Sequence, residues 1–237
     1  MFSFILFVVF LKIIVFILLK NNFINVSLGG SSDADYYHAY AIGYVDVAVN
    51  VWPIILEFLN QLGLYSRDGV AYFLLFLNLL IIPVLTSKLS GLRFKYDQKY
   101  YLYCFLLCLI YPTLFFYAFD IYRDVFMVVS FLLSCLVVKR AFSSASFLGF
   151  SFFYIIAIAL GFFLFALRPY LGYAFLMALF LWKIELTRKR LITLLLLYFL
   201  ALFVANYAGV FDRLTEYRSG FEEIEGGLHW VWISRIL

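Results

Sequence analysis

Charge is scarce in this sequence. Asp, Glu, Lys and Arg make up 14% of the 237 residues, about half the share that is usual in a soluble domain, whereas 66% of the residues are hydrophobic. This composition excludes a disordered chain and a soluble globular enzyme. Several stretches of about 20 residues are almost purely apolar, the length that a transmembrane helix needs. They are apolar on every side rather than at alternate positions, which predicts helices and not the strands of an outer-membrane barrel.

Cysteines are few, and the common catalytic motifs are missing. The three cysteines, Cys104, Cys108 and Cys135, lie in apolar runs without a C-x-x-C pair, which excludes a disulfide scaffold and argues against a zinc site. There is no P-loop and no G-x-G-x-x-G, G-x-S-x-G or H-E-x-x-H motif. The usual signatures of nucleotide-driven enzymes and hydrolases are therefore absent. An enzyme that draws its energy from an activated lipid-linked donor is not excluded.

The apolar runs predict an all-α transmembrane bundle with about seven spans, forming a single domain over residues 1–237. The predicted spans are Phe2–Leu19 (an uncleaved signal anchor), Gly69–Leu85, Tyr100–Phe119, Ile121–Val138, Phe147–Leu167, Pro169–Trp182 and Leu191–Gly209. Three basic segments alternate with them, namely Thr86–Lys99, Lys139–Arg140 and Lys183–Arg190. The positive-inside rule places these segments in the cytoplasm, so the N-terminus is predicted inside and the C-terminus outside.

The first outer loop, residues 20–68, is long and is predicted to be structured. Its segment Ala41–Leu62 is apolar, but a crossing there would move the next basic segment to the outside, against the positive-inside rule. On a helical wheel Asp46, Asn50 and Glu57 fall on one face of this segment. We therefore predict an in-plane amphipathic helix that lies on the outer membrane surface.

The same loop carries two carboxylates and an imidazole within six residues, Asp33, Asp35 and His38. One explanation is structural: Asp33 or Asp35 caps a helix that begins at Tyr36. Capping needs only one aspartate, however. The second acid, the histidine and the neighbouring aromatic residues are then left over as candidates for function.

Arginines mark two tight outer turns: Arg123 lies beside Asp124, and Arg168 precedes Pro169. Arginine at the hydrocarbon boundary is costly and usually has a partner. An ion pair that clamps helices, for example Arg123 with Asp33, or snorkelling to lipid headgroups would explain it. The alternative is an anion site, because guanidinium presents a planar fork to phosphate. Pro169 suits the first turn of a helix whose positive end would face the same anion.

The outer C-terminal segment, residues 210–237, is rich in charged residues as far as Glu225. We expect a hydrated surface loop in which Arg218 could add a third phosphate contact. After Gly227 the sequence changes abruptly to a short apolar stretch with two tryptophans. This stretch could lie in the membrane interface, or it could mark a truncation or a change of frame, which would make the product inactive.

The order of these motifs resembles the polytopic membrane glycosyltransferases of the GT-C type and the bacterial O-antigen or capsule polysaccharide polymerases. The similarity covers residues 28–225: an outer loop with Asp33–Tyr37, then Pro112–Tyr117 ahead of Arg123–Asp124, and later Leu167–Tyr170. It lies in the order of the motifs rather than in one motif. Such enzymes commonly have more spans than the seven predicted for this chain.

The resemblance implies transfer of a saccharide from a polyprenyl-phosphate or pyrophosphate donor to an acceptor hydroxyl, at the outer leaflet of a bacterial inner membrane, in surface-polysaccharide synthesis. The implied site has Asp33 or Asp35 as general base with His38 assisting, Arg123, Arg168 and Arg218 on the phosphate, and Tyr36, Tyr37, Trp52 and Asp124 at the substrate. No cofactor is required, although Asp33 and Asp35 could hold Mg²⁺ or Mn²⁺. Polysaccharide-assembly proteins are expected partners, and nucleic acid is not.

Two other functions use the same residues. A transporter or flippase of a lipid-linked or anionic solute would bind with these arginines and aspartates without making a bond. The lack of inverted repeats and of mid-span acids argues against it, and Lys12, the one charge plainly inside a span, can snorkel. A non-catalytic membrane subunit or immunity protein would use its outer loops to bind a partner.

Overall fold

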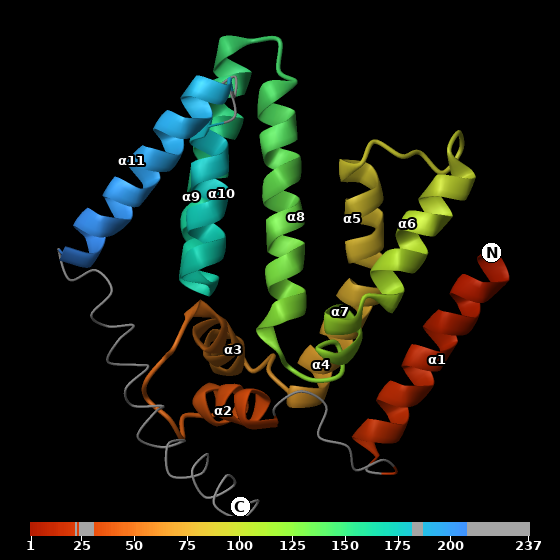
Figure 1. Ribbon diagram of the computed structural model, residues 1–237. Coiled ribbons are helices and arrows are strands. Elements are labelled where there is room, and N and C mark those ends of the chain that lie inside the picture. Colours follow the sequence, from red (N-terminus) through yellow and green to blue (C-terminus); the bar gives the residue numbers. More distant parts are fainter. Residues whose placement is uncertain (22, 24–30, 182–186, 208–237) are drawn as a thin grey trace, which may run out of the picture. The chain divides into compact units, whose positions relative to one another are not determined.

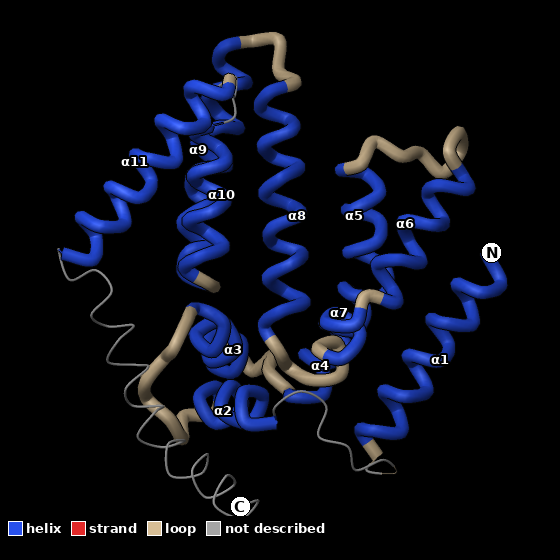
Figure 2. Tube along the Cα trace, viewed as in Figure 1, coloured by secondary structure: helices blue, strands red, loops and turns tan. Residues whose placement is uncertain are grey.

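The computed structural model describes residues 1–21, 23, 31–181 and 187–207, and every regular element in these ranges is helical (Figures 1 and 2). The predicted all-α class is therefore confirmed. The chain divides into two compact units, Met1–Leu181 and Trp182–Leu237. Within the second unit the described residues form helix α11 (Arg188–Tyr207).

The first unit contains the other helices. In chain order they are α1 (Phe2–Lys20), α2 (Ser31–Ala41), α3 (Val51–Gln61), α4 (Arg67–Phe76), the π-helical η1 (Leu77–Ile81), α5 (Ile82–Leu89), α6 (Gln98–Ile110), α7 (Pro112–Phe116), α8 (Arg123–Phe142), α9 (Phe147–Leu167) and α10 (Pro169–Leu181). Helices α4, η1 and α5 follow one another without a break, so residues 67–89 form one continuous helical segment.

Four helical segments of the described chain are long and apolar enough to cross a membrane, which indicates a membrane protein. They are Phe2–Lys20, Arg67–Leu89, Arg123–Phe142 and Phe147–Leu167. Each coincides, within a few residues, with a predicted span. Helices α6 and α10 are shorter apolar helices. The count of seven spans and the orientation stay predictions.

The predicted span Tyr100–Phe119 is interrupted. Helix α6 ends at Ile110, and α7 begins at Pro112. Between them Tyr111 has ψ 119°, because the proline ring disfavours helical geometry in the residue before it. The interruption gives one short helix of 13 residues and a single further turn in place of a full crossing.

The predicted in-plane helix Ala41–Leu62 is wrong over its first half. Helix α2 ends at Ala41, and the chain then turns at Gly43, whose φ of +82° suits a residue without a side chain. Helix α3 begins only at Val51, where the Asn50 side chain caps it by accepting a hydrogen bond from the Trp52 backbone N–H at 2.9 Å. Helix propensity and amphipathicity suggested one helix, but the glycine and the cap divide it.

The start of α2 also corrects the capping prediction. Because the helix already includes Ser31, Asp33 and Asp35 lie inside it and neither caps a helix that begins at Tyr36. Asp33 sits in the first turn, where a carboxylate interacts favourably with the helix dipole.

Packing in the first unit is closest around α9. Helix α8 packs along α9 in the opposite direction, and α10 folds back against α9. A Cβ atom on Gly172 would lie 2.2 Å from the backbone nitrogen of Phe165, so glycine lets α9 and α10 approach each other. Helix α5 packs against α6 and α8, and α2 packs against α3 (Figure 1).

Several helix termini meet at one end of the first unit, the lower end in Figure 1. Here α1 ends at Lys20, α4 begins at Arg67, α8 begins at Arg123, and α9 gives way to α10 at Arg168. Helices α2 and α3 lie at the same end. We call it the site end, and we call the end with the α5–α6 and α8–α9 connections the opposite end.

Candidate functional site at the meeting of the helix termini

Arg67 is the most highly connected charge at the site end. It is the first residue of α4, which Ser66 caps by accepting a hydrogen bond from the Gly69 N–H at 3.0 Å. Its guanidinium binds Asp120 through two hydrogen bonds, Nε to Oδ1 at 3.1 Å and Nη2 to Oδ2 at 2.7 Å. The third nitrogen, Nη1, lies 2.8 Å from Oδ1 of Asp35. Arg67 therefore ties the α7–α8 turn to α2.

Asp120 is held as a carboxylate by this arrangement. Burial alone would raise its pKa, but the hydrogen bonds and charge of Arg67, the Ile121 backbone N–H and the charge of Lys20 bring the pKa below its usual value. Lys20, at the end of α1, lies 2.7 Å from Asp68 and 3.9 Å from Asp120. Helix α1 is thus joined to the same cluster.

A second group of charges at the site end is centred on Arg168, where α9 gives way to α10, and we call this place the corner. Its extended backbone ends α9, and its carbonyl accepts hydrogen bonds from the first turn of α10. Its Nη1 lies 3.3 Å from Oδ1 of Asp124, and its guanidinium stands over the ring of Tyr170 at 4.8 Å. One contact at this distance leaves most of the five guanidinium donors of Arg168 available to a further acceptor.

Arg123 shares that corner, since it directly precedes Asp124. It is the first residue of α8 and half-buried, and among the residues described here it forms no ion pair. Its charge acts on the hydroxyl of Tyr37 in α2. The pKa of Tyr37 is raised, chiefly by burial. The charge of Arg123 and the Asn50 amide oppose this rise, whereas the charges of Asp33 and Asp124 add to it. These side chains therefore lie within electrostatic range of one another.

The chemistry of this corner favours an anion. A helix carries partial positive charge at its N-terminus, where acidic side chains are normally preferred. Here α8 begins with Arg123, and Arg168 immediately precedes α10. Two guanidinium groups thus lie at two helix N-termini, and Asp124 is the acidic partner of Arg168. Such an arrangement can bind a phosphate by bidentate hydrogen bonds and by the aligned helix dipoles.

The aromatic residues that were predicted to contact a sugar are mostly engaged within the protein. Trp52 is 2% exposed, donates a hydrogen bond from Nε1 to the Ile121 carbonyl at 2.9 Å, and packs on the ring of Phe126. Tyr37 is also buried. The indole of Trp52 therefore joins α3 to the start of α8 and does not offer the free ring face that the prediction requires.

The hydroxyl of Tyr36 faces the loop after α2, whereas the imidazole of His38 faces Tyr65 in the connection between α3 and α4. The Tyr36 hydroxyl bonds to the Val47 carbonyl and accepts the Val49 N–H. Nδ1 of His38 lies 2.9 Å from the hydroxyl of Tyr65, and the two rings stack. Burial raises the pKa of Tyr65 to about 12, against the opposing effect of the Arg67 charge. His38 is thus held by Tyr65, beside Arg67 rather than beside Arg123.

Sequence reasoning missed Arg67, because its two carboxylate partners lie 32 and 53 positions away along the chain. It also missed the surroundings of Lys12. Lys12 does not snorkel: it is 0% exposed, and its Nζ donates a hydrogen bond to Oδ1 of Asn78 at 2.9 Å and stands over the ring of Phe115 at 4.9 Å. Asn78 lies within η1, and π-helical turns are frequent at functional sites.

The remaining predictions about the site concern metal and the C-terminal segment. Among the described residues no three His, Cys, Asp or Glu side chains come together as a metal site, and Asp35 is paired with Arg67. Arg218, together with the rest of residues 210–237, lies outside the described residues.

Comparison with known proteins yields no match. No family model, no curated protein and no solved structure is significantly similar to this chain. The function is therefore argued from the site itself.

Proposed function

We propose that the protein is an integral membrane glycosyltransferase or polysaccharide polymerase that acts on polyprenyl-phosphate-linked or pyrophosphate-linked sugars. The observation that carries the proposal is the pair Arg123 and Arg168 at the N-termini of two apolar helices. A phosphate at this corner would meet two cations at the boundary of the apolar helices, and a polyprenyl tail would find apolar surface beside it. A lipid-linked phosphate combines these two properties.

The carboxylate next to this corner supplies the general base. Of the two candidates, Asp33 is favoured over Asp35, because a carboxylate oxygen of Asp35 is already held by Nη1 of the Arg67 guanidinium at 2.8 Å. Asp33 is exposed in the first turn of α2 and forms no ion pair with a described residue. An exposed aspartate can receive the proton of an acceptor hydroxyl.

The proposed reaction is a substitution at the anomeric carbon of the donor sugar. The acceptor oxygen loses its proton to Asp33 and forms the new bond, while the bond from the anomeric carbon to the phosphate oxygen breaks. The phosphate leaves with the electron pair, and Arg123 and Arg168 stabilise the charge that develops on it. The Arg67 cluster acts indirectly, by fixing the position of α2 relative to the start of α8.

The experiment is complementation of surface-polysaccharide synthesis in a strain that lacks the gene. The wild-type gene is expected to lengthen the polysaccharide ladder or to add a sugar. Asp33→Asn and Arg123→Gln are expected to abolish this gain, while the protein still inserts at a normal level. Asp46→Asn is the matched control, because Asp46 is exposed in the loop that follows α2 and forms no ion pair with a described residue. An unchanged ladder with the wild-type gene, or full function of Asp33→Asn, would contradict the proposal.

Transport of a lipid-linked or anionic solute is the second candidate, and the buried Lys12–Asn78 pair favours it. Ionisable side chains buried within membrane-spanning segments often belong to a substrate or ion pathway. A transporter would require Lys12 for flux and would tolerate Asp33→Asn. A transferase would require Asp33, and it would need Lys12 only for stability. Measuring flux and transfer with the variants Lys12→Met and Asp33→Asn separates the two functions.

A further inference from the structure

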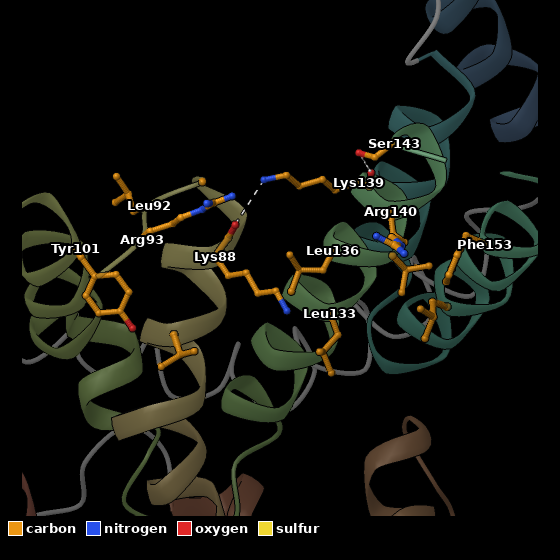
Figure 3. Close-up of a pocket in the computed structure, with 14 residues that line it drawn as sticks. Lys88, Leu92, Arg93, Tyr101, Leu133, Leu136, Lys139, Arg140, Ser143 and Phe153 are labelled. Carbon is orange, nitrogen blue, oxygen red and sulfur yellow. Dashed lines mark hydrogen bonds between the residues drawn. The ribbon is translucent and has the colours of Figure 1, made fainter. Parts of the chain in front are cut away.

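The opposite end of the first unit contains a large cavity of about 1140 Å³ between α5, α6, α8 and α9 (Figure 3). It lies at the far end of these helices from Arg123 and Asp33, so it is separate from the site of the proposed reaction. Its walls are largely aliphatic, with Leu133 and Leu136 of α8 among the lining residues. The cavity is therefore an apolar recess that opens where these helices end.

Four basic side chains surround this recess. Lys88 closes α5, Arg93 follows it in the α5–α6 connection, and Lys139 and Arg140 lie in the last turns of α8. None of the described residues that line the cavity is acidic. None of these four side chains forms an ion pair with a described residue.

Two of the four cations are held at the recess by contacts with neighbouring residues. Nζ of Lys139 donates to the backbone carbonyls of Lys88 and Leu89, at 3.5 and 3.0 Å, which joins the end of α5 to α8. The guanidinium of Arg140 lies over the ring of Phe153 in α9, 5.9 Å from its centroid. Figure 3 shows Lys88 and Arg140 on opposite sides of Leu136. The positive charge is thus distributed around an apolar centre.

Positive charge at this end is in itself what the positive-inside rule predicts for cytoplasmic loops. The cavity adds two features that topology does not require. The charges line one recess, and that recess continues along apolar helix surfaces that are long enough to lie within a membrane. Basic pockets between membrane helices on the cytoplasmic side suit the head groups of anionic lipids.

We infer that this cavity, which we call the basic cavity, binds an anionic phospholipid of the cytoplasmic leaflet. The phosphate group lies among Lys88, Arg93 and Arg140, and an acyl chain lies along Leu133 and Leu136. The site is independent of the proposed transfer reaction, since it uses none of the residues at the site end. Its occupant would hold α5 and α6 against α8 and α9, in addition to the hydrogen bonds of Lys139 and the packing of α5 on α8.

The test is a titration of the full-length protein in a neutral detergent with phosphatidylglycerol, with bound lipid counted by native mass spectrometry. The variant Arg93→Gln/Arg140→Gln removes two charges from the basic cavity. The variant Lys95→Gln/Lys99→Gln removes one charge from the α5–α6 connection and one from the first turn of α6, without touching the lining. We expect about a fivefold loss of affinity for each lining charge, hence about 25-fold for the first variant, and less than about twofold for the second.

A second variant guards against misfolding. Ser143→Glu places a negative charge on the exposed rim of the basic cavity without removing a cation, and it is also expected to weaken phosphatidylglycerol binding. Phosphatidylcholine is expected to bind weakly to all variants alike.

Three outcomes would overturn the inference. One is an equal loss of affinity in the Lys95→Gln/Lys99→Gln control, which would mean that only general surface charge matters. Another is unchanged binding in both cavity variants. The third is competition by glycerol phosphate as strong as that by phosphatidylglycerol, which would show a site for free phosphate rather than for lipid.

Discussion

The buried pair of Lys12 and Asn78 allows a quantitative test of how α1 is held in the first unit. Lys12 is fully buried, and Asn78 accepts its hydrogen bond while donating one of its own to the Leu114 carbonyl. The substitution Asn78→Leu keeps a similar volume but removes both bonds. It would leave a buried amine and a buried carbonyl without their partners.

The expected cost follows from these two losses. A buried polar group left without its partner costs about 1–3 kcal/mol and a charged one costs more, so the unpaired Lys12 amine and Leu114 carbonyl together should destabilise the protein by about 3–5 kcal/mol. Lys12→Met removes the amine itself and is expected to cost only about 1 kcal/mol, since an unbranched apolar chain can occupy the same space. The double variant should therefore be no less stable than Asn78→Leu alone. The coupling energy between the two positions should therefore be at least about 1 kcal/mol, above the average of about 0.6 kcal/mol measured for hydrogen bonds between membrane helices.

The assay is reversible unfolding of the purified protein in mixed micelles, for the wild type, the two single variants and the double variant. The free energies of unfolding give the coupling directly. A coupling near 0.6 kcal/mol, the average for ordinary interhelical hydrogen bonds, or strictly additive effects would refute the argument that Lys12 is buried as a partner of Asn78.

Three further predictions concern the site end and its support. The folded-state pKa of Asp120 is lowered, so the contribution of this carboxylate to stability is complete above its unfolded pKa near 4 and is lost as the pH falls through the folded-state pKa. Asp120→Asn should therefore reduce the loss of unfolding free energy at acidic pH. An unchanged loss at acidic pH would contradict the ion pair. Gly172→Ala should lower the free energy of unfolding by about 1–3 kcal/mol, because the new Cβ would meet the backbone of α9. Gly161→Ala should lower it less, because the nearest neighbour there is the flexible Leu176 side chain. Equal losses in micelle unfolding would contradict this packing. Trp52→Phe should cost about 1–3 kcal/mol in the same assay by leaving the buried Ile121 carbonyl unpaired, and no loss would argue against that hydrogen bond.

The four long apolar helical segments could be read from the sequence with little error. The span Phe147–Leu167 coincides with α9, since an apolar run bounded by Ser146 and by the Arg168–Pro169 pair leaves little choice of ends. The break before Pro112 was also visible in the sequence, because proline restricts the residue before it, but the apolar run on both sides concealed it. The hydrophobic pattern of a sequence shows where apolar segments lie, but it does not show a break in the helix within such a segment.

The partners of the charges could not be read in the same way. Asp35 and Asp120 meet at Arg67 only after α2, α4 and the turn before α8 are brought together. Arg168 and Asp124 were both selected from the sequence, but their pairing with each other was not predicted. A charge pattern indicates that a partner is needed and does not identify it, because contacts over tens of residues depend on tertiary packing.

The central proposal is a phosphate site formed by Arg123 and Arg168 at the start of two helices, and binding of undecaprenyl phosphate to the purified protein tests this proposal most directly. Arg123→Gln is expected to weaken binding by about 10- to 100-fold, the value of a charge-assisted hydrogen bond. Asp33→Asn should leave binding nearly unchanged, since its role is in the proton transfer, and Lys95→Gln serves as the charge-matched control. Equal affinity of the wild type and Arg123→Gln, or an equal loss in Lys95→Gln, would contradict the account.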